Sequence, residues 1–174
     1  QLVPSLVKPG VKYSEIHLAA VTRLGSALKE LGIMKGNIQD AVKAGAMGLF
    51  MPHGLGHMMG LDVHDMENYG ENYVGYDKKN VRSTQFGLSS LRLGRELQEG
   101  FVITNEPGCY FIPALIDKWK AENKCNDFID YKVLETYKDF GGIRIEDDLL
   151  VTKDGCRLLG KYIPKTVSEI EEQM

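Results

Sequence analysis

The 174-residue sequence lacks the features that mark several special classes of protein. No apolar run approaches the roughly 20 residues that a membrane helix needs, so we expect no membrane-spanning segment and no membrane partner. Basic residues are not in excess: Lys and Arg number 21, Asp and Glu number 24, and the formal net charge is −3. Without a basic footprint we expect no nucleic-acid partner. The hydrophobic share of 43% and the charged share of 26% are those of a globular domain.

Cysteine is scarce, and its placement excludes a disulfide framework. Cys109, Cys125 and Cys156 are odd in number and widely spaced, and no two of them form a Cys-x-x-Cys pair. This usage favours a reducing compartment, so we expect a cytoplasmic protein. The sequence begins at Gln1, with no initiating Met and no signal-peptide pattern. We therefore expect the chain to be part of a longer protein.

Hydrophobic periodicity predicts helices first and a sheet afterwards. The longest amphipathic pattern predicts a helix over 14–31, with Ser14 as its N-cap and Gly32 as its terminator. Shorter helices are expected after Asn37, over 113–123, over 128–138 and after Thr166, where Glu169 completes a capping box. Strands are expected at 101–104, as a buried strand over 143–151, and near 157–159 after a turn at Asp154-Gly155. This order indicates an α+β fold with a mostly antiparallel sheet.

Three of the four histidines gather in residues 53–64. They stand in His53-Gly-Leu-Gly-His57 and in Asp-Val-His64-Asp. Imidazole is the commonest neutral metal ligand and a proton shuttle. Gly54 and Gly56 disfavour a helix, so we expect a strand or tight turn with His53 and His57 on the same side. The alternative is a set of structural histidines beside glycine turns.

Two carboxylates accompany the histidines. Glu106 follows a β-rich run in Thr-Asn-Glu106-Pro-Gly, where a strand end would direct it into a cleft. Glu146 stands in Gly-Ile-Arg144-Ile-Glu146-Asp-Asp, where Ile143 and Ile145 alternate with the charged pair. The alternatives are a solvated turn and a salt-bridged outer face. Carboxylates with imidazole suit Mn²⁺, Co²⁺, Fe²⁺ or Zn²⁺, and two such ions could clamp a water for hydrolysis.

Taken together, in order and spacing, these motifs resemble those of the Xaa-Pro peptidases. That group comprises prolidase (Xaa-Pro dipeptidase) and aminopeptidase P, which are pita-bread metallopeptidases. The resemblance covers nearly the whole chain and implies that residues 1–174 form the C-terminal portion of a catalytic domain. It implies a curved, mainly antiparallel sheet with helices on its outer face, small proline-containing peptides as substrates, a homodimer, and two divalent metal ions, with Mn²⁺ favoured over Co²⁺, Fe²⁺ or Zn²⁺.

The same resemblance implies which residues bind the metal ions. His57, Glu106 and Glu146 would be three of five metal ligands, and Glu146 would bridge both ions. Glu106 would also act on the nucleophilic water as the general base. The other two ligands would be aspartates upstream of His57. The 56 residues before His57 carry no matching Asp pair and no upstream substrate histidine. We therefore expect an incomplete site in this chain, no N-terminal domain in it, and the missing N-terminal half of the same protein as a partner.

The substrate side is implied by the remaining motif residues. His64 would stabilise the tetrahedral intermediate or shuttle its proton, and His53 would lie at the rim. Arg144 would orient the substrate or neighbouring ligands. Arg92, in Ser-Leu-Arg92, resembles an arginine that holds the substrate carboxylate.

Four functions remain open from the sequence. The helical segment between Cys109 and Phe140 resembles an insertion common in prolidases and favours the dipeptidase over aminopeptidase P. The third function is that of a catalytically dead pita-bread binding module, and the fourth is that of a metal-free relative acting on C–N bonds of amidines. The intact His57, Glu106 and Glu146 argue against the third and the fourth.

Overall fold

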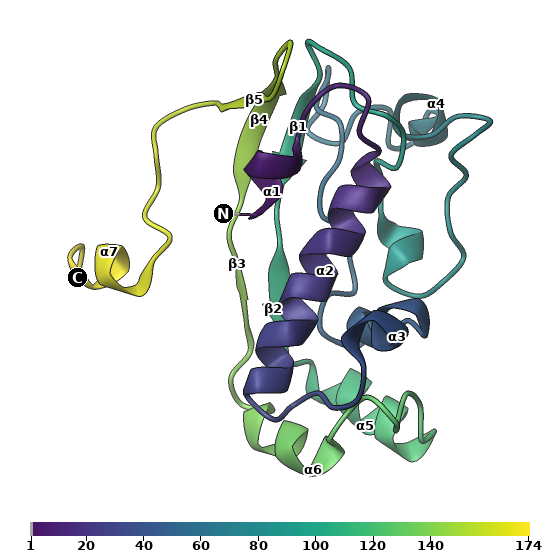
Figure 1. Ribbon diagram of the computed structural model, residues 1–174, viewed down its shortest axis with the longest axis vertical. Coiled ribbons are helices and arrows are strands. Elements are labelled where there is room, and N and C mark those ends of the chain that lie inside the picture. Colours follow the sequence, from purple (N-terminus) through teal and green to yellow (C-terminus); the bar gives the residue numbers. More distant parts are fainter. Residues whose placement is uncertain (1) are drawn as a thin grey trace.

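The computed structural model describes residues 2–174 and combines helices with antiparallel strands (Figure 1). The helices are α1 (Leu2–Leu6), α2 (Tyr13–Glu30), α3 (Ile38–Lys43), α4 (Glu71–Gly75), α5 (Pro113–Ala121), α6 (Tyr131–Leu134) and α7 (Val167–Glu171). The strands are β1 (Val102–Asn105), β2 (Gly108–Tyr110), β3 (Gly142–Arg144), β4 (Asp147–Val151) and β5 (Cys156–Leu158). Within residues 2–174, none of the helices has the length and apolar character of a membrane span. The expected α+β class is confirmed.

Helix α2 is the longest element and lies across the strands in Figure 1. It agrees within a residue with the helix predicted over 14–31. The predicted N-cap is wrong: Lys12 stands at the cap position, without a side-chain hydrogen bond. Ser14 lies inside the helix and its hydroxyl donates to the carbonyl of Gly94, 3.1 Å away, because a loop from the second half of the chain packs there. Gly32 adopts φ +74° after the helix, as a terminator should.

The sheet is built around one long two-stranded ribbon. β1 pairs with β4, β2 pairs with β3, and β5 adds to the free edge of β4; all these pairs are antiparallel. Between β1 and β2 the ribbon is interrupted at Glu106-Pro107, and between β3 and β4 it is interrupted at Ile145-Glu146. The pairing register is the same on both sides of the interruption. Glu106 and Glu146 therefore stand opposite each other.

The segment Leu55–Met59 lies along the other edge of β1. The amide of Thr104 donates to the carbonyl of His57 at 3.0 Å, and the amide of Glu106 donates to the carbonyl of Leu55 at 2.8 Å. The predicted non-helical conformation of the histidine motif is confirmed. Gly56 permits this close approach, since a Cβ there would overlap the carbonyl oxygen of Thr104.

The strand predicted over 143–151 is only partly buried. The predicted strand is divided into two strands, β3 and β4. In β4, Leu149 and Val151 are buried in the core. Ile143 is 57% exposed, which contradicts the predicted buried strand at that end. β3 pairs with β2 alone, so among the described residues no third strand pairs with its free edge.

The helical insertion after β2 lies beyond the C-terminal end of α2 (Figure 1), where the amide of Lys35 donates to the carbonyl of Phe128 and the amide of Asp130 donates to the carbonyl of Ile33, both at 2.9 Å. α5 confirms the helix predicted over 113–123, whereas the helix expected over 128–138 is shortened to α6 followed by a 3₁₀ turn. The cause is Asp130, whose carboxylate accepts from the amides of Lys132 and Val133 and so starts the helix there.

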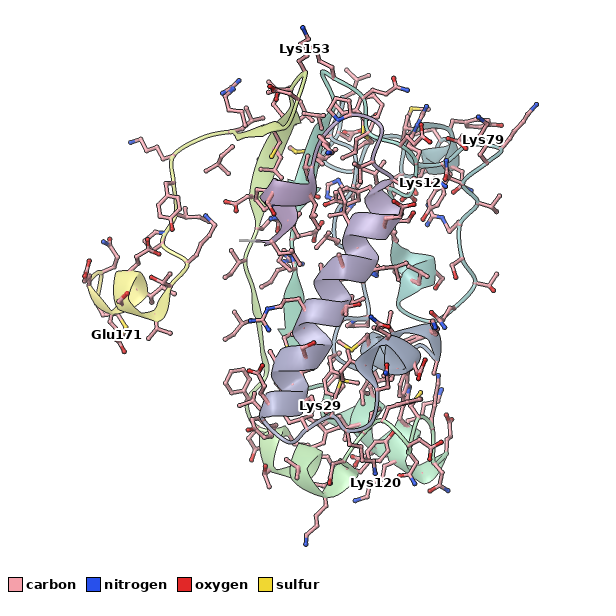
Figure 2. The ribbon with its side chains drawn as sticks, viewed as in Figure 1. Lys12, Lys29, Lys79, Lys120, Lys153 and Glu171 are labelled. Carbon is pink, nitrogen blue, oxygen red and sulfur yellow. The ribbon has the colours of Figure 1, made fainter. Side chains whose placement is uncertain are left out.

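The C-terminal residues form an arm that extends from the body of the molecule to α7 (Figure 1). The capping box between Thr166 and Glu169 is present, as expected. The amides of Lys165 and Thr166 and the hydroxyls of Thr166 and Tyr162 lower the pKa of Glu169 to about 2. Figure 2 shows the side chains of Lys79 and Lys153 extending away from the body of the molecule.

Candidate functional site

Three neighbouring segments bring the predicted metal-ligating residues to one part of the sheet. His57 lies on the edge segment beside β1, Glu106 follows β1, and Glu146 precedes β4. Opposed residues on antiparallel strands direct their side chains to the same face, about 4.5–5.5 Å apart at Cβ. Pro107 has no amide to donate to the ladder, which accounts for the interruption that releases Glu106 from regular pairing.

His57 is oriented by its own main chain. Its ring Nδ1 lies 3.0 Å from the carbonyl oxygen of Met58. A carbonyl can only accept, so Nδ1 carries the proton and Nε2 presents a lone pair in the neutral ring. That lone pair lies 3.4 Å from Oε1 of Glu106, and both side chains are largely buried, with 5% and 13% exposed. Two acceptors facing each other at this distance are stabilised by a cation or a proton between them.

Thr104 links the two ligating segments. Its hydroxyl accepts from the amide of His57 at 3.0 Å and donates to Oε1 of Glu106 at 3.1 Å. The carboxylate of Glu106 is thereby fixed relative to the backbone that carries His57.

Arg144 lies between the two opposed carboxylates. Its guanidinium is 3.7 Å from Oε2 of Glu106 and 3.4 Å from Oε2 of Glu146. Like charges directly opposite on a sheet are destabilising, and the arginine compensates for them.

The donor set fits part of a metal site. Two carboxylates and a correctly oriented imidazole are the ligand types that Mn²⁺, Fe²⁺, Co²⁺ and Zn²⁺ accept. Among the described residues, Glu146 is nevertheless linked to Glu106 through the guanidinium of Arg144. Within residues 2–174, no three His, Cys, Asp or Glu side chains are close enough together to hold an ion.

His64 and Arg92, both predicted on the substrate side, share one partner. The rings of His57 and His64 stand nearly perpendicular with centroids 4.3 Å apart. His64 Nδ1 lies 2.8 Å from one carboxylate oxygen of Glu67, whose other oxygen lies 2.6 Å from the guanidinium of Arg92. Arg92 also contacts Glu71 at 3.2 Å. The sequence motifs did not indicate either glutamate.

His53 lies apart from this cluster. Its Nδ1 is 2.7 Å from the carbonyl of Gly54, its ring packs edge-on against Tyr110, and its buried Nε2 has no hydrogen-bond partner among the described residues. The structure therefore places His53 beside the site without a direct contact to His57.

Two residues of α2 that no sequence motif indicates support the site from behind. The hydroxyl of Tyr13 donates to the carbonyl of Thr104 at 2.7 Å, and the amide of Leu55 donates to Nδ1 of His17 at 3.2 Å. Burial, followed by the charge of Glu106, raises the pKa of Tyr13 far above its usual value. Burial, followed by His53, lowers the pKa of His17 to about 4. Tyr13 and His17 are therefore both neutral at pH 7. In the sequence, the only sign of their role is a polar group on the buried face of the helix.

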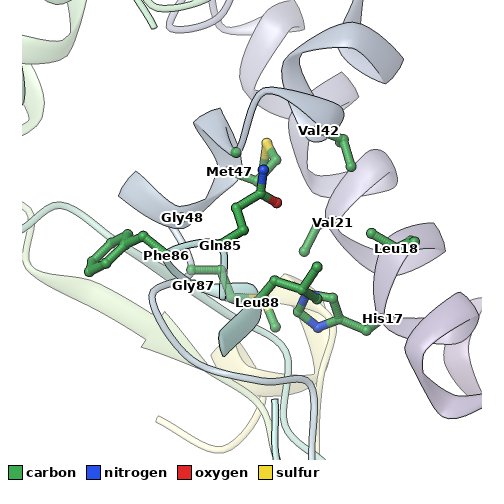
Figure 3. A pocket seen from close by; sticks show the side chains of 12 residues that line it. His17, Leu18, Val21, Val42, Met47, Gly48, Gln85, Phe86, Gly87 and Leu88 are labelled. Atoms are coloured by element: carbon green, nitrogen blue, oxygen red, sulfur yellow. The ribbon is translucent and has the colours of Figure 1, made fainter. Parts of the chain in front are cut away.

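Figure 3 shows His17 reaching from α2 into a pocket lined by Gln85 and Leu88. The cavity measures about 20 Å³, so no peptide fits in it. A hollow of about 390 Å³ lies instead over His64 and Glu67.

Comparison with known proteins identifies the family of this chain and several relatives. The sequence matches metallopeptidase family M24 over residues 2–153. It is 41% identical over 172 residues to human Xaa-Pro dipeptidase, covering 99% of this chain and 33% of that protein. It is 39% identical over 167 residues to a probable Xaa-Pro aminopeptidase of Fusarium vanettenii, covering 96% of this chain and 34% of that protein.

Solved structures give the same picture. A variant of Escherichia coli aminopeptidase P superposes with a TM-score of 0.68 and 32% identity, covering 98% of this chain and 30% of that one. Aminopeptidase PepP of Pseudomonas aeruginosa also gives a TM-score of 0.68, with 30% identity and 98% and 31% coverage. The chain spans about a third of the length of the curated relatives it matches.

Proposed function

Because this chain belongs to metallopeptidase family M24 and shares the pita-bread fold of its structural neighbours, we propose that it carries part of the catalytic site of an Xaa-Pro dipeptidase. The observation that carries the proposal is the register of the long ribbon, which sets Glu106 opposite Glu146 and beside His57. Aminopeptidase P is the second candidate, because proteins of both names are among its relatives.

The family implies divalent metal ions, and we propose two, most simply Mn²⁺. His57 through Nε2, Glu106 and Glu146 would hold them, with Glu146 shared. Bound metal ions would polarise the scissile carbonyl and acidify a water. Glu106 accepts the proton of that water in this proposal, and Thr104 keeps its carboxylate in place. Arg144 orients the two carboxylates and the substrate beside them.

The substrate side is formed by His64, His53 and Arg92. His64 stands against His57, where it could deliver a proton or stabilise the oxyanion. His53 would line the rim, and Arg92 would hold a substrate carboxylate. Selectivity for proline requires a pocket for a nitrogen without an N–H donor. The insertion that contains α5 and α6 supports the dipeptidase over the aminopeptidase, as it resembles the prolidase insertion.

We further propose that residues 1–174 are the C-terminal portion of a catalytic domain in a cytoplasmic homodimer. Another stretch of polypeptide would supply two aspartates and cover the free side of β3. A groove of about 480 Å³ between α1, α2 and Ile145 supports this, because it is mostly apolar. Asn105 lines the same groove, and its buried Oδ1 has no partner among the described residues.

The direct test is a chimera in which this chain replaces the matching third of human Xaa-Pro dipeptidase. We expect Mn²⁺-dependent hydrolysis of Gly-Pro, with little activity on Gly-Pro-Ala. Preference for the tripeptide would select the aminopeptidase. A folded chimera that binds Mn²⁺ and cleaves neither peptide would contradict the proposal and favour a binding module.

A further inference from the structure

The carboxylate of Glu67 contacts both His64 and Arg92, the two side chains proposed to lie on the substrate side of the site. One oxygen lies 2.8 Å from Nδ1 of His64 and the other lies 2.6 Å from NH2 of Arg92. Hydrogen bonds from His64 and then from Arg92 hold the pKa of Glu67 below its usual range. Glu67 is therefore an anion at neutral pH, placed between an imidazole and a guanidinium.

This arrangement is the one that a bound carboxylate would adopt. Arginine and imidazole donors directed at two oxygens of one carboxylate form a typical recognition site for that group. A hollow of about 390 Å³ lies over the His64 and Glu67 side of this arrangement and is lined by Asp62, Val63, His64, Glu67, Asn68 and Tyr69, while Arg92 lies outside that lining. That volume lies within the range of small-molecule sites. The perpendicular contact between His64 and His57 places the hollow beside the candidate metal ligands.

We propose that Glu67 is an internal competitor for a ligand carboxylate, and that a ligand with a free C-terminal carboxylate binds by displacing Glu67 from His64 and Arg92. The nature of the ligand, a proline-ended peptide, rests on the proposed function; the competition itself does not.

The competition is weak enough for a ligand to win. The side chain of Glu67 is 42% exposed, and those of His64 and Arg92 are 37% and 28% exposed. Ion pairs exposed to this degree contribute little, because water solvates the separated charges well. A ligand carboxylate can therefore replace Glu67, while an amide cannot, since it brings only one weak acceptor to two donors. Glu67 thus raises the concentration at which acidic ligands bind and leaves neutral ligands unaffected.

The test uses the 174-residue chain and two probes, N-acetyl-L-proline and N-acetyl-L-prolinamide, with binding followed through the NMR signals of the His64 ring. In Glu67→Gln and Glu67→Ala we expect the acid to bind about three- to tenfold more tightly than in the unchanged chain. The amide should bind equally weakly to all three. Asp62→Asn is the matched control, since it removes a carboxylate from the same hollow, and the hydrogen bonds and ion pairs of His64 and Arg92 go to Glu67 and Glu71 instead.

The outcomes separate competition from a supporting role. Equal or weaker binding of the acid in both Glu67 variants would overturn the proposal and make Glu67 a support for His64. Absence of acid binding to Glu67→Ala at millimolar concentration would also overturn it, because His64 and Arg92, with Arg92 then held by Glu71 alone, would form no carboxylate site. These measurements need neither metal nor turnover. An inactive chimera would therefore count against the proposed function alone.

Discussion

Glu106 contacts more of the site than any other side chain, touching His57, Thr104 and Arg144. We predict that Glu106→Gln, made in the chimera, lowers kcat by about 10²- to 10⁴-fold, because the amide cannot accept the proton of the attacking water. Steady-state hydrolysis of Gly-Pro measures the effect, and circular dichroism checks that the fold is kept. Glu99→Gln changes an exposed glutamate in a turn and should leave kcat unaltered. Near-normal turnover by Glu106→Gln would remove the general-base assignment.

His17 gives the stability of the chain a predictable dependence on pH. Its pKa falls to about 4 in the folded chain, from an ordinary value near 6.5, through burial and then His53. Because the pKa of His17 is lower in the folded chain, the unfolded chain binds the proton more readily. The contribution of neutral His17 to the free energy of unfolding is therefore complete above about pH 6.5 and is lost as the pH falls toward 4. We predict that unfolding free energy drops by on the order of 2–3 kcal/mol from this group between pH 7.5 and 4.5.

Urea unfolding of the unchanged chain and of His17→Gln at both pH values isolates this contribution. The glutamine oxygen can still accept from Leu55 but does not titrate, so the variant should lose less stability at low pH. Equal losses in the two proteins would show that His17 does not titrate with a lowered pKa.

At the residue scale, short motifs identified the side chains that meet at the site. The glycine before His57 permits close approach to β1, and the proline after Glu106 interrupts the strand. Both effects on the backbone follow from the residue type. Tyr13 and His17 could not be found in this way, since their roles depend on which distant carbonyl or amide packs against α2. Glu67 was missed for the same reason: its partner Arg92 lies 25 residues away.

At the scale of elements, the edge segment Leu55–Met59 depends on close approach to β1. We predict that Gly56→Ala lowers the unfolding free energy by more than about 3 kcal/mol, because its Cβ would overlap the carbonyl of Thr104 and force the strands apart. Gly155→Ala is the control, as its nearest neighbour would be 4.0 Å away, and it should change stability by less than about 1 kcal/mol. Thermal unfolding of both variants compares them, and equal melting temperatures would contradict the close approach.

Elements with local signals were predictable, and elements defined by their neighbours were not. The apolar period of α2, the Asn37 cap of α3 and the capping box of α7 are all local, and all are present. The Ser14 cap failed because Gly94 takes its hydroxyl. The division of 143–151 into β3 and β4 arises from the interrupted partner strand, which no local pattern in 143–151 reveals.

At the scale of the whole molecule, the proposed metal ligands of this chain are too few for the two ions that we propose. Arg144 supplies one positive charge to Glu106 and Glu146, and three aligned ligands are not enough for two ions. We predict that the isolated chain binds Mn²⁺ weakly and below two ions per chain, as measured by calorimetry and by metal analysis after dialysis. The chimera should bind two. Tight binding of two ions by the isolated chain would mean that other residues here replace the proposed aspartates.

The free edge of β3 favours self-association of the isolated chain. Ile143 is more than half exposed on a strand whose outer edge has no partner among the described residues, and the mostly apolar groove that includes Ile145 lies nearby. Unpaired edges and apolar patches favour association. We predict that the chain self-associates as its concentration rises, and that Ile143→Lys shifts it toward the monomer in sedimentation velocity. Val81→Lys, an equivalent change at an 80% exposed valine in the loop after α4, should not. An unchanged monomer fraction in Ile143→Lys would place the contact elsewhere on the surface.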